Sequence, residues 1–365
     1  MRVGIFGAGS IGNHLAFSAR KIGASVSVCD SSIAALERFK DEIYPSRYGT
    51  FDPEIKLVNR DSFLSDYYDV IFIGTPPDSH LELLKIAISA KPKIICIEKP
   101  VATPNLSEIK EFADILENAE PTILAGYNHR VGRNTAIALD YLCTFPLGEI
   151  KFLESVVLES WDGILAAHPW LNGPEDSYLG FTERGGGATF EHSHGIDLWC
   201  FFANYLNLGD VVSLTAQASF VLNSFGGEYD ESISIQLATE NGIVGEVHQN
   251  VTEKNTKKWV EITGERGSIR SSVGVLPGVD KVRWESKADP KISIESQVNK
   301  PRYDDFDREL EVIKNIFSGE ATAKDPRLSA KSALKSALIG IAAISSAKAN
   351  ATAYLDFKNW EFKLR

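Results

Sequence analysis

The sequence predicts an α/β protein: a doubly wound parallel sheet first, then an α+β domain with a large, mostly antiparallel open sheet. Over the first 126 residues, short apolar runs alternate with amphipathic helical stretches, as strands and covering helices do in a parallel sheet. Beyond residue 126, alternating polar and apolar positions and short turns such as Glu240-Asn241-Gly242 indicate hairpins. The 365 residues suffice for two domains, which we place at 1–126 and 127–365.

The strands expected in the first domain are short and continuously apolar, which suits strands buried on both faces. They are Arg2–Phe6, Ser25–Cys29, Val70–Ile73, Lys93–Ile97 and Thr122–Ala125. The helices between them are expected at Ile11–Lys21, Ser31–Lys40, Ser79–Ser89 and Leu106–Asn118. Asn105 stands just before the last helix and Glu108 follows three residues later, which is the pattern of a capping box.

The second domain begins with an expected helix at Asn134–Cys143. Its strands are expected at Glu149–Ser160, Val211–Leu222, Ser232–Ala238, Gly242–Val251, Lys258–Thr263, Ser268–Ser272 and Lys281–Glu285. The last elements expected are two helices and a short strand, at Asp304–Phe317, Leu328–Ser346 and Tyr354–Phe357. The successive apolar residues Val156, Val157 and Leu158 predict a sheet face that needs covering, so we expect a homodimer or homotetramer formed through this sheet.

The composition argues against several classes of partner. Thirty-eight Lys and Arg against 49 Asp and Glu give a net charge of −11, and so acidic a surface repels nucleic acid and anionic membranes. No run approaches the ~18–20 apolar residues of a membrane helix. The sequence lacks the apolar core and cleavage site of a signal peptide, and its four cysteines form no CxxC pair. We therefore expect a cytoplasmic protein with no nucleic-acid or membrane partner.

A glycine motif, Gly7-Ala8-Gly9-Ser10-Ile11-Gly12, follows the first strand and opens a helix. Gly7 allows a tight turn, Gly9 lets the backbone approach a pyrophosphate, and Gly12 lets helix and strand pack closely. The free N–H groups of the helix N-terminus favour phosphate charge. We therefore expect this segment, including Ser10 and Ile11, to bind a dinucleotide. The alternative is a glycine turn that binds no ligand.

Asp30 ends the second strand, 18 residues after Gly12. A carboxylate at this place accepts hydrogen bonds from the adenosine ribose hydroxyls. It would repel a 2′-phosphate, and the next residues, Ser31 and Ser32, supply no positive charge. The expected cofactor is therefore NAD rather than NADP.

Two further motifs follow apolar strands, where open α/β sheets bind their ligands. After Val70–Ile73 comes Gly74-Thr75-Pro76-Pro77-Asp78-Ser79-His80, and after Lys93–Ile97 comes Glu98-Lys99-Pro100. The alternative for Lys99 is a surface ammonium paired with Glu98, but a lysine placed directly after a buried strand is a candidate functional group. The cofactor contacts expected here are Thr75, Pro76, Pro77, His80, Glu98 and Lys99.

Together with Gly126-Tyr127-Asn128-His129-Arg130 and the segment from Gly185-Gly186-Gly187 to Glu191-His192-Ser193-His194, these motifs give the chain a resemblance to a known family. It resembles the glucose–fructose oxidoreductase/inositol dehydrogenase/MocA family along essentially its whole length. The resemblance implies an NAD(P)-dependent oxidoreductase that acts on a sugar, cyclitol, sugar phosphate or nucleotide sugar. It also implies that Lys99 and His194 are catalytic, that Glu98 orients the lysine, and that Asn128 and Arg130 contact the substrate.

The segment around His194 departs from the family pattern, because Glu191 stands where the family usually has Asp. Residues three apart on a helix share a face, so we expect Glu191 and His194 to act in one cleft while His192 points elsewhere. In the alternative register, His192 is the acid/base. Four residues (His168, Glu191, His192 and His194) suggest a metal site, but two histidines two apart on a helix splay their rings roughly 200° apart. No metal site is therefore expected.

The loop before this segment contains Trp161, Asp162, His168, Trp170 and Tyr178. Its aromatic and polar side chains suit a wall that faces a sugar. We therefore count Trp161, Asp162 and His168 as substrate contacts, beside Lys99, Glu191 and His194. The alternative is that the aromatic residues only pack the loop against the domain.

In the expected reaction, His194 accepts the proton of a substrate hydroxyl, because an imidazole with a pKa near ~6.5 titrates close to neutral pH. Lys99 hydrogen-bonds the developing alkoxide. One alternative is an NAD-dependent lyase or glycosidase that oxidises a sugar carbon transiently, for which His192 or His168 supplies an extra base. The other is a non-catalytic dinucleotide-binding regulator.

Overall fold

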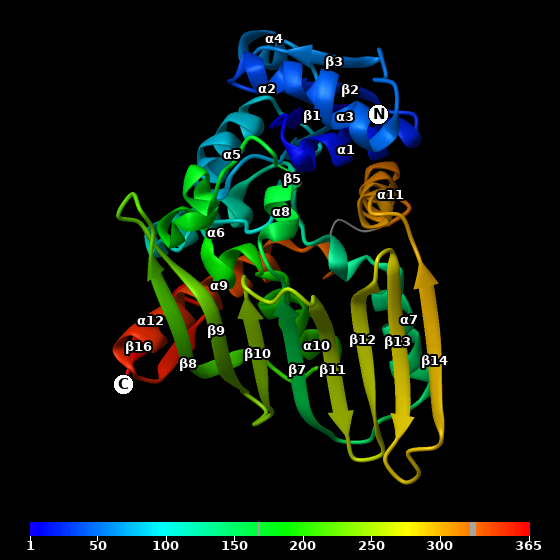
Figure 1. The fold of residues 1–365 in the computed structure, drawn as a ribbon, viewed down its shortest axis with the longest axis vertical. Coiled ribbons are helices and arrows are strands. Elements are labelled where there is room, and N and C mark those ends of the chain that lie inside the picture. The colour runs from blue at the N-terminus through cyan, green and yellow to red at the C-terminus, as the bar shows by residue number, and fades with distance from the viewer. Residues whose placement is uncertain (167, 322–325) are drawn as a thin grey trace.

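The computed structural model describes residues 1–166, 168–321 and 326–365, and contains a smaller sheet at the top of Figure 1 and a larger one below it. The first sheet has the order β3-β2-β1-β4-β5-β6, and all its strand pairs are parallel. This confirms the predicted doubly wound domain. Its strands are β1 Arg2–Phe6, β2 Ser25–Cys29, β3 Ile55–Val58, β4 Val70–Ile73, β5 Ile94–Glu98 and β6 Thr122–Gly126.

Helices cover both faces of this sheet, as its buried strands require. They are α1 Ser10–Lys21, α2 Ile33–Arg38, α3 Tyr44–Tyr48, α4 Arg60–Leu64, α5 His80–Ser89 and α6 Leu106–Asn118. Asn105 caps α6 as predicted, because its side chain accepts from the backbone N–H groups of Ser107 and Glu108. The Glu108 carboxylate accepts from the Thr103 hydroxyl instead of completing the capping box.

The second sheet has the order β14-β13-β12-β11-β7-β10-β9-β8-β15-β16, and its described strand pairs are antiparallel except β7 with β10. The predicted strands are present. Its strands are β7 Ile150–Leu158, β8 Val211–Leu222, β9 Glu228–Thr239, β10 Val244–Asn250, β11 Lys257–Gly264, β12 Gly267–Leu276, β13 Val279–Ser286, β14 Ser293–Asn299, β15 Ala353–Asp356 and β16 Glu361–Leu364. The helices after β6 are α7 Arg133–Thr144, α8 Asp162–Ala166, α9 Gly187–Glu191, α10 His194–Tyr205, α11 Asp304–Ser318 and α12 Ala330–Ala349.

The last two helices return to the first domain. Figure 1 shows α11 just below α1, and these helices contact one another. Phe306, Leu310 and Ile313 of α11 belong to the same buried cluster as Val3 and Ile5 of β1, while α12 contacts α6. Apolar burial therefore joins the two parts of the chain on both sides of the gap between the sheets.

The expectation of an exposed apolar face at residues 156–158 is wrong. Val156 and Val157 are 3% and 5% exposed, and Leu158 is half-buried. These residues therefore give no argument for covering the sheet, and a homo-oligomer formed through it stays a prediction. No helix in the described part of the chain is long and apolar enough to cross a membrane.

Arg130 forms an ion pair that is completely buried, which makes the predicted substrate contact of this residue wrong. It ends the short 3₁₀ turn Asn128–Arg130 after β6 and pairs with Asp197 of α10 through both guanidinium edges, with 2.6 Å between Nε and Oδ2. Both side chains are 0% exposed. Ser332 and Ser336 of α12 complete the network, so the ion pair joins β6, α10 and α12.

Arg130→Leu should lower the free energy of unfolding by about 3–5 kcal/mol, because it leaves the Asp197 carboxylate buried without its partner. The matched control is Arg60→Leu, whose arginine is 52% exposed in a surface ion pair with Glu82 and should contribute about 0–1 kcal/mol. Urea unfolding curves measure both. Equal destabilisation by the two changes would contradict a structural role for Arg130.

Candidate active site

The glycine motif forms a turn with room for a phosphate. Gly7 has a φ of +105°, and a Cβ on it would lie 2.6 Å from the Gly74 carbonyl oxygen. A Cβ on Gly12 would lie 1.9 Å from the Gly7 carbonyl oxygen, so both positions exclude a side chain. A Cβ on Gly9 would meet no atom within 4 Å. Open space therefore borders Gly9 just where α1 begins, as a dinucleotide diphosphate requires.

Asp30 lies against the same turn. Its Oδ2 accepts from the Ala8 backbone N–H at 2.8 Å, and its Oδ1 accepts from the Ser32 N–H at 2.9 Å. These bonds fix a carboxylate beside the glycine motif, at the position from which the ribose hydroxyls are recognised. The geometry agrees with a preference for NAD over NADP, which stays a prediction.

In the segment after β4, one of the expected cofactor contacts instead stabilises the turn of the segment itself. His80 is 0% exposed, and its Nε2 lies 2.8 Å from the Thr75 carbonyl oxygen. Burial lowers its pKa, so the imidazole is neutral. The expected cofactor contact through His80 is therefore wrong. Pro77 is also buried and faces Gly185 of the second domain, whereas Thr75 and Pro76 remain accessible.

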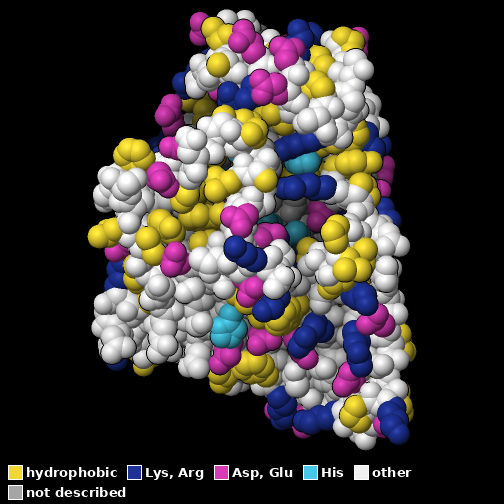
Figure 2. All heavy atoms as spheres, in the orientation of Figure 1, with side chains coloured by type: hydrophobic (Ala, Val, Ile, Leu, Met, Phe, Trp, Pro, Cys, Tyr) yellow, Lys and Arg dark blue, Asp and Glu magenta, His cyan; other side chains and the backbone are white. Residues whose placement is uncertain are grey.

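A cavity of about 210 Å³ lies between the ends of the first sheet and the second domain. Figure 2 shows a hollow in this region, with Lys or Arg and His side chains gathered around it. The cavity wall combines positively and negatively charged side chains with apolar ones, which range from valines to Phe202 and Trp259. Its charged and imidazole side chains are Lys99, His129, Glu159, Glu191, His192, His194, Lys258 and Arg302.

Lys99 reaches this cavity from the end of β5 and is held there by Glu191. Its Nζ donates to Glu191 Oε1 at 3.0 Å and to the Glu191 carbonyl oxygen at 2.9 Å. Tyr178 donates its hydroxyl to Glu191 Oε2 at 2.7 Å. Burial and then the neighbouring Glu191 raise the pKa of Tyr178 well above its usual value, so the phenol keeps its proton and this bond.

Glu98 does not orient the lysine as expected, because the ammonium bonds to Glu191 instead. Glu98 is 5% exposed, and burial and then Glu309 raise its pKa well above the usual range. The peptide bond between Lys99 and Pro100 is cis. Whether Glu98 contacts the cofactor stays a prediction.

The two candidate histidines both line the cavity, so the expectation that His192 points elsewhere is wrong. The cause is a helix break: α9 ends at Glu191 and α10 begins at His194, so these residues do not share one helix face. His192 Nε2 lies 3.0 Å from the Glu159 carbonyl oxygen. His194 Nδ1 is buried and has no hydrogen-bond partner within the described residues.

The surroundings of His194 keep it neutral. Burial, then His129 and Lys99, lower its pKa well below the usual value for histidine. His194 is therefore an uncharged imidazole at neutral pH, with a nitrogen that can accept a proton. Glu191, which bonds to Lys99 and Tyr178, leaves His194 unpaired.

Several cavity residues were not predicted. The ring centroid of His129 lies 4.1 Å from that of His194, and His129 Nδ1 lies 3.4 Å from Asp305 Oδ2. Although burial opposes it, hydrogen bonds from His129 and the charge of Lys300 lower the pKa of Asp305 to about 2. Lys258 pairs with Glu159 at 2.5 Å. His129 lies inside the quoted G-Y-N-H-R motif, which was the only signal for this group.

Besides Arg130, four expected substrate contacts do not line the cavity: Asn128, Trp161, Asp162 and His168. Trp161 is 6% exposed and packs with Leu179, Ala188 and Val251, as the alternative of loop packing expects. His168 Nδ1 lies 2.7 Å from the Ile164 carbonyl oxygen, and its ring contacts Trp170. Contacts of Asn128, Trp161, Asp162 and His168 with substrate stay predictions.

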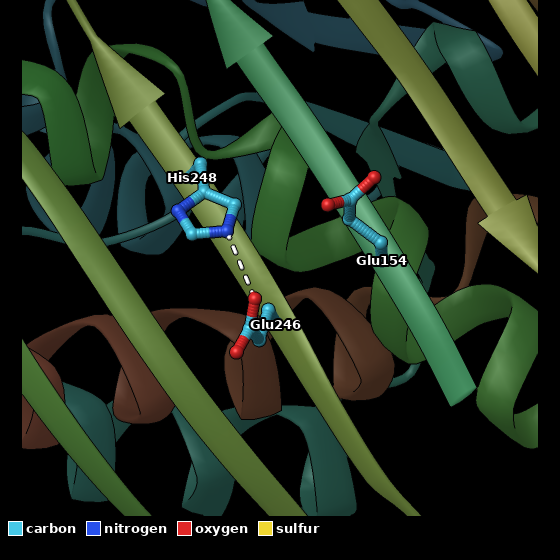
Figure 3. Close-up of side chains that lie close together, drawn as sticks. All are labelled: Glu154, Glu246 and His248. Atoms are coloured by element: carbon cyan, nitrogen blue, oxygen red, sulfur yellow. Dashed lines mark hydrogen bonds and ion pairs between the residues drawn. The ribbon is translucent and has the colours of Figure 1, made fainter. Parts of the chain in front are cut away.

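A second polar cluster lies on the open face of the large sheet, and none of its three members lines the cavity. Figure 3 shows His248 pointing toward Glu246 on β10, with Glu154 on the adjacent β7. Their potential ligand atoms lie within 4.8 Å of one another. Each member already has a protein partner, because Trp259 donates to Glu154, Gln236 donates to Glu246 and Ser234 bonds to His248. We interpret this cluster as a cross-strand polar network.

Gly9→Val should abolish dinucleotide binding while leaving the thermal unfolding midpoint nearly unchanged, because its side chain enters open space that the diphosphate needs. Gly12→Val is the matched control: its side chain meets the Gly7 carbonyl oxygen, so it should lower the unfolding midpoint itself. Isothermal titration with NAD and thermal unfolding measure the two effects. Unchanged NAD affinity in Gly9→Val would show that the phosphate binds elsewhere.

Two family models match the chain. The model described as an oxidoreductase family with an NAD-binding Rossmann fold, GFO_IDH_MocA, matches residues 1–127. The GFO/IDH/MocA C-terminal domain matches residues 146–270. The matches agree with the order of the motifs described above. A comparison with curated proteins finds no match.

Several solved structures share the fold along nearly the whole chain. A levoglucosan dehydrogenase in complex with NADH and levoglucosan is 20% identical, with a TM-score of 0.74 and coverage of 98% of this chain and 99% of that one. A putative myo-inositol dehydrogenase from Sinorhizobium meliloti is 19% identical, with a TM-score of 0.73 and coverage of 98% of this chain and 100% of that one. The WlbA dehydrogenase from Bordetella pertussis, in complex with NADH and UDP-GlcNAcA, is 18% identical, with a TM-score of 0.71 and coverage of 98% of this chain and 99% of that one.

At these identities the structural likeness concerns the fold, whereas the two family models identify the sequence. Their combined span exceeds half of the chain and includes the glycine motif, Lys99, Glu191 and His194. The chain belongs to the GFO/IDH/MocA family of oxidoreductases, and its first domain is the NAD-binding Rossmann fold of that family.

Proposed function

We propose that this protein transfers a hydride between NAD and a hydroxyl-bearing carbon of one sugar or cyclitol molecule. The observation that carries this proposal is the convergence of Lys99, Glu191 and His194 on one cavity, beside the dinucleotide-binding domain. The names of the similar structures support the substrate class, since they include a dehydrogenase bound to levoglucosan and a putative myo-inositol dehydrogenase.

The size and chemistry of the cavity favour a single ring. Its volume of about 210 Å³ is below the roughly 300–1,000 Å³ typical of pockets for drug-sized ligands, so a nucleotide sugar would have to extend outside it. Carboxylates, ammonium groups and imidazoles supply acceptors and donors for several hydroxyls. Val156, Val157 and Val260 supply apolar surface for ring C–H groups.

NAD accepts the hydride when it is bound, and the chain's own residues manage the proton. His194 is neutral and accepts the proton of the substrate hydroxyl. Lys99 donates a hydrogen bond to the same oxygen and stabilises the negative charge that develops there. Glu191 and Tyr178 hold the Lys99 ammonium in place, so Glu191 acts as a positioning residue.

A second candidate function is an NAD-dependent lyase or glycosidase that oxidises the sugar only transiently. The observation that favours it is the presence of His192 and His129 in the same cavity, because elimination needs an additional base. His168, the other expected base, does not line the cavity. A non-catalytic regulator is less well supported, because such a protein has no need for Lys99 and His194.

Incubation with NAD and single sugars or cyclitols tests the proposal. We expect NADH to accumulate with at least one monosaccharide or cyclitol, as measured by its near-ultraviolet absorbance. Accumulation with nucleotide sugars and with no single sugar or cyclitol is not expected. Consumption of substrate without net NADH would support the lyase or glycosidase instead. No turnover across either class would contradict both enzymatic proposals.

His194→Asn should lower kcat about 10²–10⁴-fold, because it removes the proton acceptor, while the Kd of NAD should stay the same. His192→Asn is the matched control, since the histidine lies two residues away in the same cavity, and it should cost less. If His192→Asn proves the more damaging change, the acid/base role belongs to His192.

The pH dependence provides a further test. A base with a lowered pKa remains neutral in mildly acidic solution, so oxidation should persist well below pH ~6.5 and fail only as the pH drops through the pKa of His194. His129→Gln removes the neighbouring imidazole that lowers this pKa, so the acidic limb of kcat/KM should shift to higher pH. His248→Gln, on the open sheet face, should keep the wild-type profile. An unshifted limb in His129→Gln would contradict the coupling.

A further inference from the structure

Two arginines, Arg47 and Arg302, lie near enough to each other at the gap between the domains for their charges to interact. Arg47 directly precedes Tyr48 of α3, and Arg302 directly precedes Tyr303. The rings of these tyrosines lie 6.0 Å apart, and Phe17 of α1 contacts both, at 3.7 Å from Tyr48 and 5.0 Å from Tyr303. Each arginine is therefore next in sequence to a member of one aromatic cluster, and the charges of both act on the neighbouring His14.

The charges of Arg47 and Arg302 are not balanced by carboxylates. Most arginines in the described residues pair with Asp or Glu, but these two form no ion pair there. Burial lowers the pKa of Arg47, and Arg302 lowers it further by repulsion. Burial and then the two arginines also lower the pKa of the adjacent His14 to about 3, so this histidine adds no charge. In a chain with a net charge of −11, two neighbouring unpaired cations call for an anion.

Arg47 contacts the glycine motif, and Arg302 lines the cavity of the candidate active site. Arg47 donates to the Ser10 carbonyl oxygen at 2.9 Å and to Ser10 Oγ at 2.8 Å, and Ser10 is the first residue of α1. Arg302 is exposed and lines the cavity that also contains Lys99 and His194. Figure 2 shows Lys or Arg side chains beside a histidine at this gap. One anion between the two guanidinium groups would therefore contact both domains.

We propose that Arg47 and Arg302 together bind one phosphate group at this gap. Guanidinium groups offer planar pairs of N–H donors that match phosphate oxygens and keep their charge at all relevant pH values. Two molecules present in the proposed reaction can supply the phosphate: the dinucleotide, through its diphosphate, or a substrate that carries a phosphate. In both cases the bound phosphate bridges the first and second domains.

The substrate alternative rests on the proposed function, whereas the dinucleotide alternative needs only the NAD binding of the family. The test therefore measures binding rather than turnover, so its failure is distinct from failure of the proposed reaction. The variants are Arg302→Met and Arg47→Met, which keep much of the side-chain volume and remove the charge. Arg283→Met is the matched control, because Arg283 is a half-exposed arginine of β13 paired with Glu285.

Isothermal titration with NAD is the first arm. If the dinucleotide supplies the phosphate, both variants should raise the Kd of NAD at least tenfold, as expected for loss of a charge-assisted hydrogen bond, and inorganic phosphate should compete with NAD in the wild type. The control variant should keep the wild-type Kd. Arg302 forms no hydrogen bond in the described residues, so Arg302→Met should also keep the wild-type unfolding midpoint.

Titration of inorganic phosphate into the NAD-loaded protein is the second arm. If the substrate supplies the phosphate, NAD affinity should be unchanged in both variants, the NAD-loaded wild type should bind inorganic phosphate, and both variants should lose that binding at least tenfold. If only Arg47→Met weakened the binding of NAD or phosphate, the proposal of a shared site would be overturned. The role of Arg47 would then be limited to its hydrogen bonds with Ser10. Unchanged binding of NAD and phosphate in both variants would overturn the proposal entirely.

Discussion

The contact between Lys99 and Glu191 unites the two halves of the candidate active site. Lys99 follows β5 of the first domain and Glu191 ends α9 of the second, and their side chains are only 15% and 10% exposed. A charge pair so far from water is stable only when its remaining hydrogen-bonding groups are satisfied. The Tyr178 hydroxyl and the Glu191 carbonyl oxygen provide this. The lysine is thereby held at one point of the cavity, and the packing of α11 and α12 against the first domain keeps both halves together.

The site needs a charged lysine and a neutral histidine within one small cavity, and the distribution of carboxylates meets both needs. Glu191 is bound to Lys99 and Tyr178, Asp305 to His129 and Lys300, and Glu159 to Lys258. His194 has no such partner, so burial and the surrounding cations lower its pKa. A nitrogen that accepts a proton therefore lies beside a group that stabilises negative charge, which is the combination that alcohol oxidation requires.

The sequence was sufficient where short-range patterns decide the structure. The parallel sheet, the glycine turn and the lysine after β5 follow from apolar periodicity and local motifs. The short strand β3 was missed because its four residues include the exposed Lys56. The fate of Arg130 was missed because its partner Asp197 comes from a helix 67 residues away. Because the helix breaks at His192, the predicted helix faces of this segment were wrong. The contacts of Asp305 and Lys258 depend on long-range packing, which no short sequence motif indicates.

A double-mutant cycle on hydride transfer tests most directly whether Glu191 acts through Lys99. The variants are Lys99→Met, Glu191→Gln and the double variant, measured at saturating NAD with protiated and deuterated substrate, so that the isotope effect isolates the chemical step. If the carboxylate serves to position the ammonium, the double variant should be no slower than Lys99→Met alone. If the fold-losses in hydride-transfer rate of the two single variants multiplied in the double variant, this account would be contradicted. Glu191 would then contribute to the reaction independently of Lys99.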